Sequence, residues 1–205
     1  KLAIGHDLLR PVFSILDPEY TFTVNQYHTA AGVVDILSHL FEQYFTPDQE
    51  GYLQNRLMEA MMKTVIEYGP IAYNELDDYE ARANLMWTSS LALNGMVTYG
   101  KVSTDWATHG MEHELSAFYD ITHGVGLGIL TPYWMKYVLS EENVHRFVEY
   151  GKNVWNLDGE NNMEIANKAI NKTREFFSSL GIPSTLKEVG IDESKLEKMA
   201  RSEER

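Results

Sequence analysis

The sequence has 205 residues, no cysteine and a formal net charge of −13, and 44% of its residues are hydrophobic. The negative charge, without any run of lysine and arginine, argues against nucleic acid and anionic membranes as partners. The missing cysteines exclude disulfides, thiolate zinc sites and a cysteine nucleophile, and they fit a reducing compartment, so we predict a cytoplasmic protein.

The first segment with a clear pattern covers residues 11–24. A short apolar run of Val12, Phe13, Ile15 and Leu16 is interrupted by the turn residues Asp17-Pro18, which predicts a strand. The sequence carries no signal peptide and begins without methionine, as if it started within a longer protein. A lone strand needs a partner, and the rest of the chain offers few.

The remainder of the sequence is helical in pattern. Apolar residues at helical spacing predict helices over residues 29–45, 52–69, 78–97, 109–118, 124–139, 140–157 and 162–180, with a short one after Asp192. Thr29 is a candidate N-cap for the first helix, and Pro132 should interrupt or kink the fifth. The expected fold is a mainly α bundle of about seven or eight helices with one N-terminal strand. No stretch of 18 apolar residues predicts a membrane span.

Three of the seven histidines lie within 15 positions, at His109, His113 and His123. His109 and His113 are four residues apart, so a helix places them on one face. His123 precedes three alternating glycines, whose small size lets a helix approach its neighbours or a ligand closely. Neutral imidazole is the commonest metal ligand, so this cluster is a candidate metal site.

The helix predicted over residues 29–45 supplies further candidate ligands. Asp35 and His39 share one face, beside or within its apolar stripe, where an unpaired carboxylate costs several kcal/mol. A metal ion, an arginine or a hydrogen bond to His39 would remove that cost. One carboxylate with several imidazoles and no thiolate suits Fe(II), Zn or a similar divalent ion in a bundle core. Spacing alone leaves open whether His109 pairs with His113 or with His123 at the metal.

Two other motifs suggest a helical metallohydrolase. His109 to His113 fits H-x-x-E-H, the inverzincin pattern, in which Glu112 would act as a general base. The pair His6-Asp7 is similar to the histidine–aspartate pair of HD-type phosphohydrolases. A non-enzymatic metal-binding bundle is a third interpretation. The lone histidines His28 and His145, like His6, are expected at the surface or at caps.

The chain resembles the C-terminal half of the iron-containing (group III) alcohol dehydrogenases, and in particular their butanol dehydrogenase-like branch. The matching stretches are FSILDPEYTFTV, TAAGVVDILSHLFEQYF, DWATHGMEHELSAFYDITHGVGLGILTPYWMKYV and LGIPSTLKEVGID, in family order. The resemblance implies a dehydroquinate synthase-like α domain and a homodimer. It also implies hydride transfer between NAD(H) or NADP(H) and a short-chain alcohol or aldehyde.

The same resemblance implies roles for individual residues. It assigns the divalent metal, Fe(II) or alternatively Zn, to Asp35, His39, His109 and His123. It places His113 beside the nicotinamide, where the residue would help to relay a proton.

Family members also carry an N-terminal α/β domain that binds NAD(P). We therefore expect residues 1–25 to be the end of that domain and residues 26–205 to be a truncated form of the helical metal-binding domain. By itself such a piece should bind metal without turning over substrate.

Overall fold

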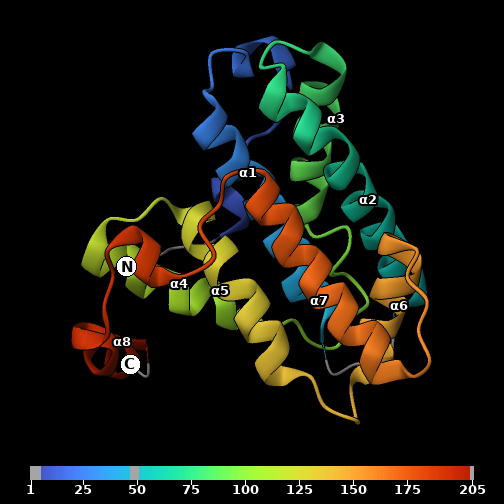
Figure 1. The fold of residues 1–205 in the computed structure, drawn as a ribbon. Helices are drawn as coiled ribbons and strands as arrows, with labels where there is room; N and C mark the ends of the chain where they lie inside the picture. The colour runs from blue at the N-terminus through green and yellow to red at the C-terminus, as the bar shows by residue number, and fades with distance from the viewer. Residues whose placement is uncertain (1–5, 47–50, 204–205) are drawn as a thin grey trace.

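The computed structural model describes residues 6–46 and 51–203, which form a helical bundle (Figure 1). Its eight α-helices within the described residues are α1 (Gln26–Tyr44), α2 (Tyr52–Asn74), α3 (Tyr79–Leu93), α4 (Ala107–Tyr119), α5 (His123–Val138), α6 (Val144–Trp155), α7 (Asn162–Ser179) and α8 (Leu196–Glu203). Four short 3-10 helices accompany them: η1 (Asp7–Leu9), η2 (Pro18–Thr21), η3 (Leu186–Val189) and η4 (Glu193–Lys195). The predicted mainly α bundle is confirmed. None of the helices in the described ranges is long and apolar enough to cross a membrane.

The predicted N-terminal strand is wrong for the described residues. Between η1 and η2 the chain has no regular secondary structure, and Pro18–Thr21 is a 3-10 helix capped by the Asp17 side chain. Phe13 and Ile15 are 78% and 83% exposed. A strand needs a neighbour for its backbone hydrogen bonds, and the described part of the chain offers none to this segment.

Helix α1 is the centre of the bundle, in contact with α2, α3, α4 and α5. Its buried stripe includes Val34, Leu37, Phe41 and Tyr44, none more than 1% exposed. The helix starts earlier than the predicted Thr29 cap, because the Asn25 side chain accepts a hydrogen bond from the backbone N–H of His28 (3.0 Å). The earlier start adds almost one turn in front of the predicted ligands.

Other predicted helix limits shift by a few residues. Helix α2 continues through Pro70 to Asn74, and Gly69 packs closely against Val33 of α1. Helix α3 ends at Leu93, before Gly95, whose φ is +95°. Pro132 lies inside α5 without ending it. A small second core of Leu115, Ile191 and Met199 holds α8 against α4, at the edge of the bundle (Figure 1).

Close packing of α5 on α1 depends on glycine. A Cβ atom at Gly124 would lie 2.0 Å from the carbonyl oxygen of Ala31, and one at Gly128 would lie 3.1 Å from Val34. Real Cβ atoms do not approach backbone oxygens so closely, so α1 and α5 can touch here only because the glycines have no side chain. The close approach brings His123, the first residue of α5, beside α1.

Candidate metal centre

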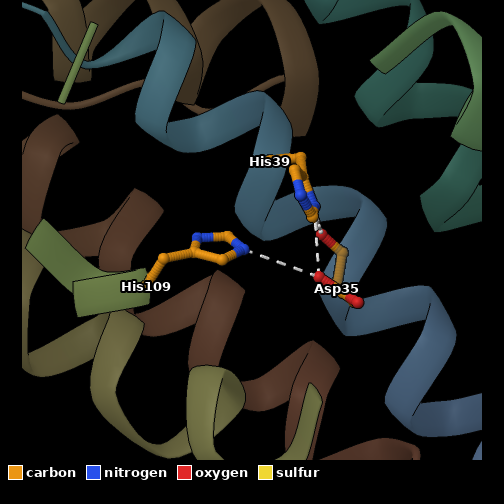
Figure 2. Close-up of side chains that lie close together, drawn as sticks. All are labelled: Asp35, His39 and His109. Atoms are coloured by element: carbon orange, nitrogen blue, oxygen red, sulfur yellow. Dashed lines mark hydrogen bonds and ion pairs between the residues drawn. The ribbon is translucent and has the colours of Figure 1, made fainter. Parts of the chain in front are cut away.

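The four residues predicted as ligands come together around one carboxylate oxygen. Asp35 and His39 project from α1, and His109 projects from α4 toward them (Figure 2). The Oδ1 atom of Asp35 lies 3.1 Å from His39 Nδ1, 3.8 Å from His109 Nε2 and 3.9 Å from His123 Nε2. Three helices therefore bring three imidazoles within 4 Å of one carboxylate oxygen, and the ligand atoms of Asp35, His39 and His109 also lie within 4.8 Å of one another.

Two of these atoms are buried without a hydrogen-bond partner among the described residues, namely Asp35 Oδ1 and His109 Nε2. Separations of 3.8 and 3.9 Å are too long for hydrogen bonds. Metal–ligand bonds to nitrogen and oxygen are about 2.0–2.2 Å, so one divalent cation can bridge either pair. The residues present thus fit a metal ion, because a cation would satisfy polar atoms that otherwise lack a partner.

The electrostatics of the site also favour a positive charge. Burial by itself lowers the pKa of His109, but the nearby carboxylates of Asp35 and Glu42 outweigh it and raise this pKa to about 9. Burial would raise the pKa of the Asp35 carboxyl, yet the nearby imidazoles of His109 and His39 hold it well below its usual range. The site attracts a proton or, in its place, a cation.

Two buried glutamates contact the Nδ1 atoms of His109 and His123, on the side of each ring opposite to Nε2. Glu42 Oε2 accepts a hydrogen bond from His109 Nδ1, and Glu112 Oε2 accepts one from His123 Nδ1. Glu42 is 1% exposed and Glu112 is 0% exposed. Glu42 was not among the predicted site residues, and Glu112 was considered only as the general base of the H-x-x-E-H pattern. A signal was available, because Asp35, His39 and Glu42 follow i, i+4, i+7 spacing on one face of α1.

His113 and Trp106 lie at the edge of the cluster. The His113 ring is stacked on that of His123 at 5.6 Å between centroids, and 6.3 Å from that of His109. Trp106 is 39% exposed and lies edge-on to the rings of His39 and His109. No pattern in the sequence distinguishes this tryptophan.

The remaining histidines do not join the site. His6 is exposed, and its Nδ1 accepts a hydrogen bond from the backbone N–H of Leu8 (3.1 Å). His28 is exposed and His145 is half-buried. None of the three belongs to the clusters of potential ligand atoms found in the described residues, Asp35–His39–His109 and Glu112–His113–His123.

The fold and the site define a helical-bundle domain built around a buried cluster of one aspartate and several histidines. Residues 29–203 match the model of the C-terminal part of the Fe-containing alcohol dehydrogenase family. The chain belongs to this family and corresponds to its C-terminal helical domain.

Curated proteins and solved structures agree with this assignment. NADH-dependent butanol dehydrogenase A of Clostridium acetobutylicum is 59% identical over 202 residues, which cover 98% of this chain and 52% of that protein. The NADH-dependent butanol dehydrogenase A structure from Thermotoga maritima has a TM-score of 0.91 at 36% identity, covering 98% of this chain and 50% of that one. For the aldehyde reductase YqhD from E. coli, the TM-score is 0.88 at 37% identity, with coverage of 95% and 51%. The chain spans about half the length of the curated relatives it matches.

Proposed function

We propose that this chain is the metal-binding half of an alcohol dehydrogenase that transfers hydride between NAD(P)(H) and a short-chain alcohol or aldehyde. The names of its relatives support this reaction class, because they include NADH-dependent butanol dehydrogenases and an NADPH-dependent aldehyde reductase. Both nucleotides occur among these names, so the proposal covers NAD and NADP. A homodimer is part of the proposal through the family resemblance.

One observation carries the proposal: the buried Asp35 Oδ1 atom accepts no hydrogen bond among the described residues and faces two imidazole Nε2 atoms at 3.8 and 3.9 Å. We propose Asp35, His39, His109 and His123 as the ligands of a divalent cation. A carboxylate oxygen with imidazoles suits Fe(II) and also accepts Zn. The family name favours iron.

When bound, the cation supplies Lewis acidity, which lowers the pKa of an alcohol or polarises an aldehyde carbonyl. The chain's own residues position the reactants. Asp35 and His39 lie on the wall of an open pocket of about 380 Å³ between α1, α3 and η2. Most of its other lining residues are apolar, including Val33, Ile36 and Leu85. Such a surface can hold a short alkyl chain and exclude water from the reacting end.

His113 has the position expected of a proton relay. Its ring is half-buried and stacks on that of His123 at the edge of the cluster. The neighbouring rings of His109 and His123 instead direct their Nε2 atoms toward Asp35 Oδ1. We propose that His113 lies beside the nicotinamide and passes the alcohol proton toward solvent. An imidazole suits this task because its ordinary pKa is close to neutral pH.

The hydrolase alternatives receive less support from the geometry. A general base must reach a water molecule, yet Glu112 is fully buried and its two oxygens accept hydrogen bonds from Ser116 and His123. His6 of the HD-like pair is exposed and outside the histidine cluster. Glu112 is therefore better suited to orient a histidine than to activate water.

The test is metal content per chain after anaerobic loading with Fe(II) and desalting, for the unaltered chain and for His123→Ala and His113→Ala. We expect His123→Ala to lose the metal and His113→Ala to retain it. The reverse pattern would favour the H-x-x-E-H interpretation, and peptide hydrolysis would then become the activity to measure. If the unaltered chain took up no metal, both the proposed ligand set and the H-x-x-E-H interpretation would be wrong.

A further inference from the structure

We infer that Glu42 and Glu112 are positioning residues that hold His109 and His123 with the proton on Nδ1 and the Nε2 lone pair directed at the metal position. This inference rests on the proposed function, since it assumes that a cation binds beside Asp35. It adds two buried carboxylates to the site and gives each a separate geometrical task.

The proton positions follow from the partners. Ionised carboxylate oxygens accept hydrogen bonds and cannot donate them, so the Nδ1 atoms facing Glu42 Oε2 and Glu112 Oε2 must be the donors. In a neutral imidazole the other nitrogen then carries the free lone pair. For both rings that nitrogen is Nε2, which lies 3.8 or 3.9 Å from Asp35 Oδ1.

Glu42 also fixes the helix that carries His109. Its Oε1 atom accepts hydrogen bonds from the backbone N–H groups of Thr108 (2.7 Å) and His109 (3.1 Å), in the first turn of α4. The N-cap residue of this helix, Trp106, makes no side-chain capping bond. The Asp105 side chain accepts a hydrogen bond from the backbone N–H of Ala107 (2.8 Å), and the Glu42 carboxylate from α1 satisfies the next two N–H groups of the helix. Glu42 thus contributes both to the start of α4 and to the orientation of the His109 ring.

Glu112 performs the second task from α4 to α5. Its Oε2 atom accepts from His123, and its Oε1 atom accepts from the hydroxyl of Ser116, one turn further along α4. Gly126 makes room for it, because a Cβ atom there would lie 2.8 Å from Glu112 Cγ. The second of the three alternating glycines therefore accommodates the carboxylate that orients His123.

His39 is held differently. Its Nδ1 lies 2.9 Å from the backbone carbonyl oxygen of Asp35, in addition to the Asp35 carboxylate. Among the hydrogen bonds of the described residues, none joins the His39 ring to a buried glutamate. Carboxylate partners behind a ligand histidine raise its basicity and fix its orientation, and their loss costs about 10–100-fold in metal affinity. Loss of either glutamate should therefore weaken binding, although neither touches the metal.

Substitution by glutamine should have different effects at Glu42 and at Glu112. At Glu42 all three hydrogen bonds come from N–H donors, so the NH2 group of a glutamine would face a donor. At Glu112 the NH2 group can donate to the Ser116 hydroxyl while the amide oxygen still accepts from His123. Glu42→Gln should therefore weaken metal binding more than Glu112→Gln does.

The test is Zn(II) affinity, measured by competition with a chromophoric chelator, alongside the urea unfolding of each metal-free variant. The matched control is Glu59→Gln, since Glu59 is also buried (4% exposed) and multiply hydrogen-bonded but lies in a separate network. We expect affinity to fall about 10–100-fold in Glu42→Gln and Glu112→Leu, to change about threefold or less in Glu112→Gln, and to stay unchanged in Glu59→Gln. Proton-detected ¹⁵N spectra of the unaltered Zn(II)-loaded chain should show Nδ1–H on His109 and His123.

The outcomes separate the two proposals. Failure of the unaltered chain to bind Zn(II) or Fe(II) would overturn the proposed function and this inference together. Normal binding by the unaltered chain, with Glu42→Gln and Glu112→Leu no weaker than Glu59→Gln, would overturn the positioning role alone. Should Glu42→Gln fail to fold, the spectra decide, because protons on Nε2 would contradict the inference.

Discussion

Two buried acidic clusters meet helix α1 at different points, and their partners differ. The histidine site consists of Asp35, Glu42 and Glu112 with His39, His109 and His123, and its ion pairs among the described residues are all with imidazoles. The arginine network consists of Glu59 and Glu149 with Arg56, Arg146, Tyr44 and Asn153.

The difference lies in the permanence of the positive charge. Arg56 Nη2 lies 2.7 Å from Glu59 Oε1, and arginine keeps its charge at every pH at which the protein folds. Imidazoles are charged only when protonated and must lose that proton to bind a metal, so a cation can replace protons in balancing the three carboxylates of the histidine site. In the arginine network two arginines balance two glutamates, and we expect the network to contribute to stability. The histidine site is completed by a cation, and the following predictions test this distinction.

The largest effect is expected for Asp35→Asn. The substitution removes the anionic oxygen around which the imidazoles converge, and we expect a loss of more than about 100-fold in Fe(II) or Zn(II) affinity. The measurement is a metal titration with a competing chelator. Glu149→Gln, in the arginine network, serves as control and should bind metal normally. An Asp35→Asn chain that retained a full equivalent of metal would refute the assignment.

Gly124→Ala should damage the histidine site through packing. A Cβ atom there would lie 2.0 Å from the Ala31 carbonyl oxygen, so α5 must move away from α1 and carry His123 with it. We expect a loss of about 3 kcal/mol in the free energy of unfolding, together with weaker metal binding. Urea unfolding and metal titration measure the two effects. Unchanged values for both would show that the helices are farther apart than described.

Metal should stabilise the folded chain through the histidine site. Ligand at 100 times its dissociation constant adds about 2.7 kcal/mol to the free energy of unfolding. We expect this increase with Fe(II) under anaerobic conditions, its loss on adding a chelator, and its absence in Asp35→Asn. Equal stabilisation of Asp35→Asn and the unaltered chain would place the bound metal elsewhere.

In the arginine network we expect a substitution to lower stability without changing metal affinity. Glu59→Ala leaves the buried Tyr44 hydroxyl and the Asn153 amide without their acceptor, and we expect a loss of about 2 kcal/mol in stability. Metal affinity should not change, because Glu59 makes no contact with the histidine site. Thermal unfolding of the metal-free chain, followed by metal titration below its midpoint, checks both statements. A drop in metal affinity would show that the two clusters are coupled through α1.

Much of the fold could be predicted from the sequence, whereas the grouping of Asp35 and His39 with His109 and His123 came from the family resemblance, because spacing alone left the choice of histidines open. Helical periodicity located the long helices, and the i, i+4 spacing of Asp35 and His39 put them on one face. Residues 11–24 were harder, since an apolar run predicts a strand only if a partner strand exists. The spacing of Glu42 indicates that it shares a face of α1 with Asp35 and His39, but not that it contacts the first turn of α4, 66 positions further along the chain. The contact between Trp106 and His39 spans a similar distance in sequence and has no signal in a single helix.

The smallest predicted effect concerns Gly32, on the helix that both clusters share. A Cβ atom at Gly32 would meet nothing within 4 Å, in contrast to Gly124. Alanine in a helix interior is favoured over glycine by about 0.5–1 kcal/mol, so Gly32→Ala should stabilise the chain by that amount. Because the methyl group touches neither cluster, metal affinity should stay as in the unaltered chain. Calorimetric unfolding measures the gain in stability, and a metal titration measures the metal affinity. A gain in stability accompanied by weaker metal binding would mean that the site depends on the flexibility of α1. The two clusters would then differ in their dependence on backbone motion as well as in charge.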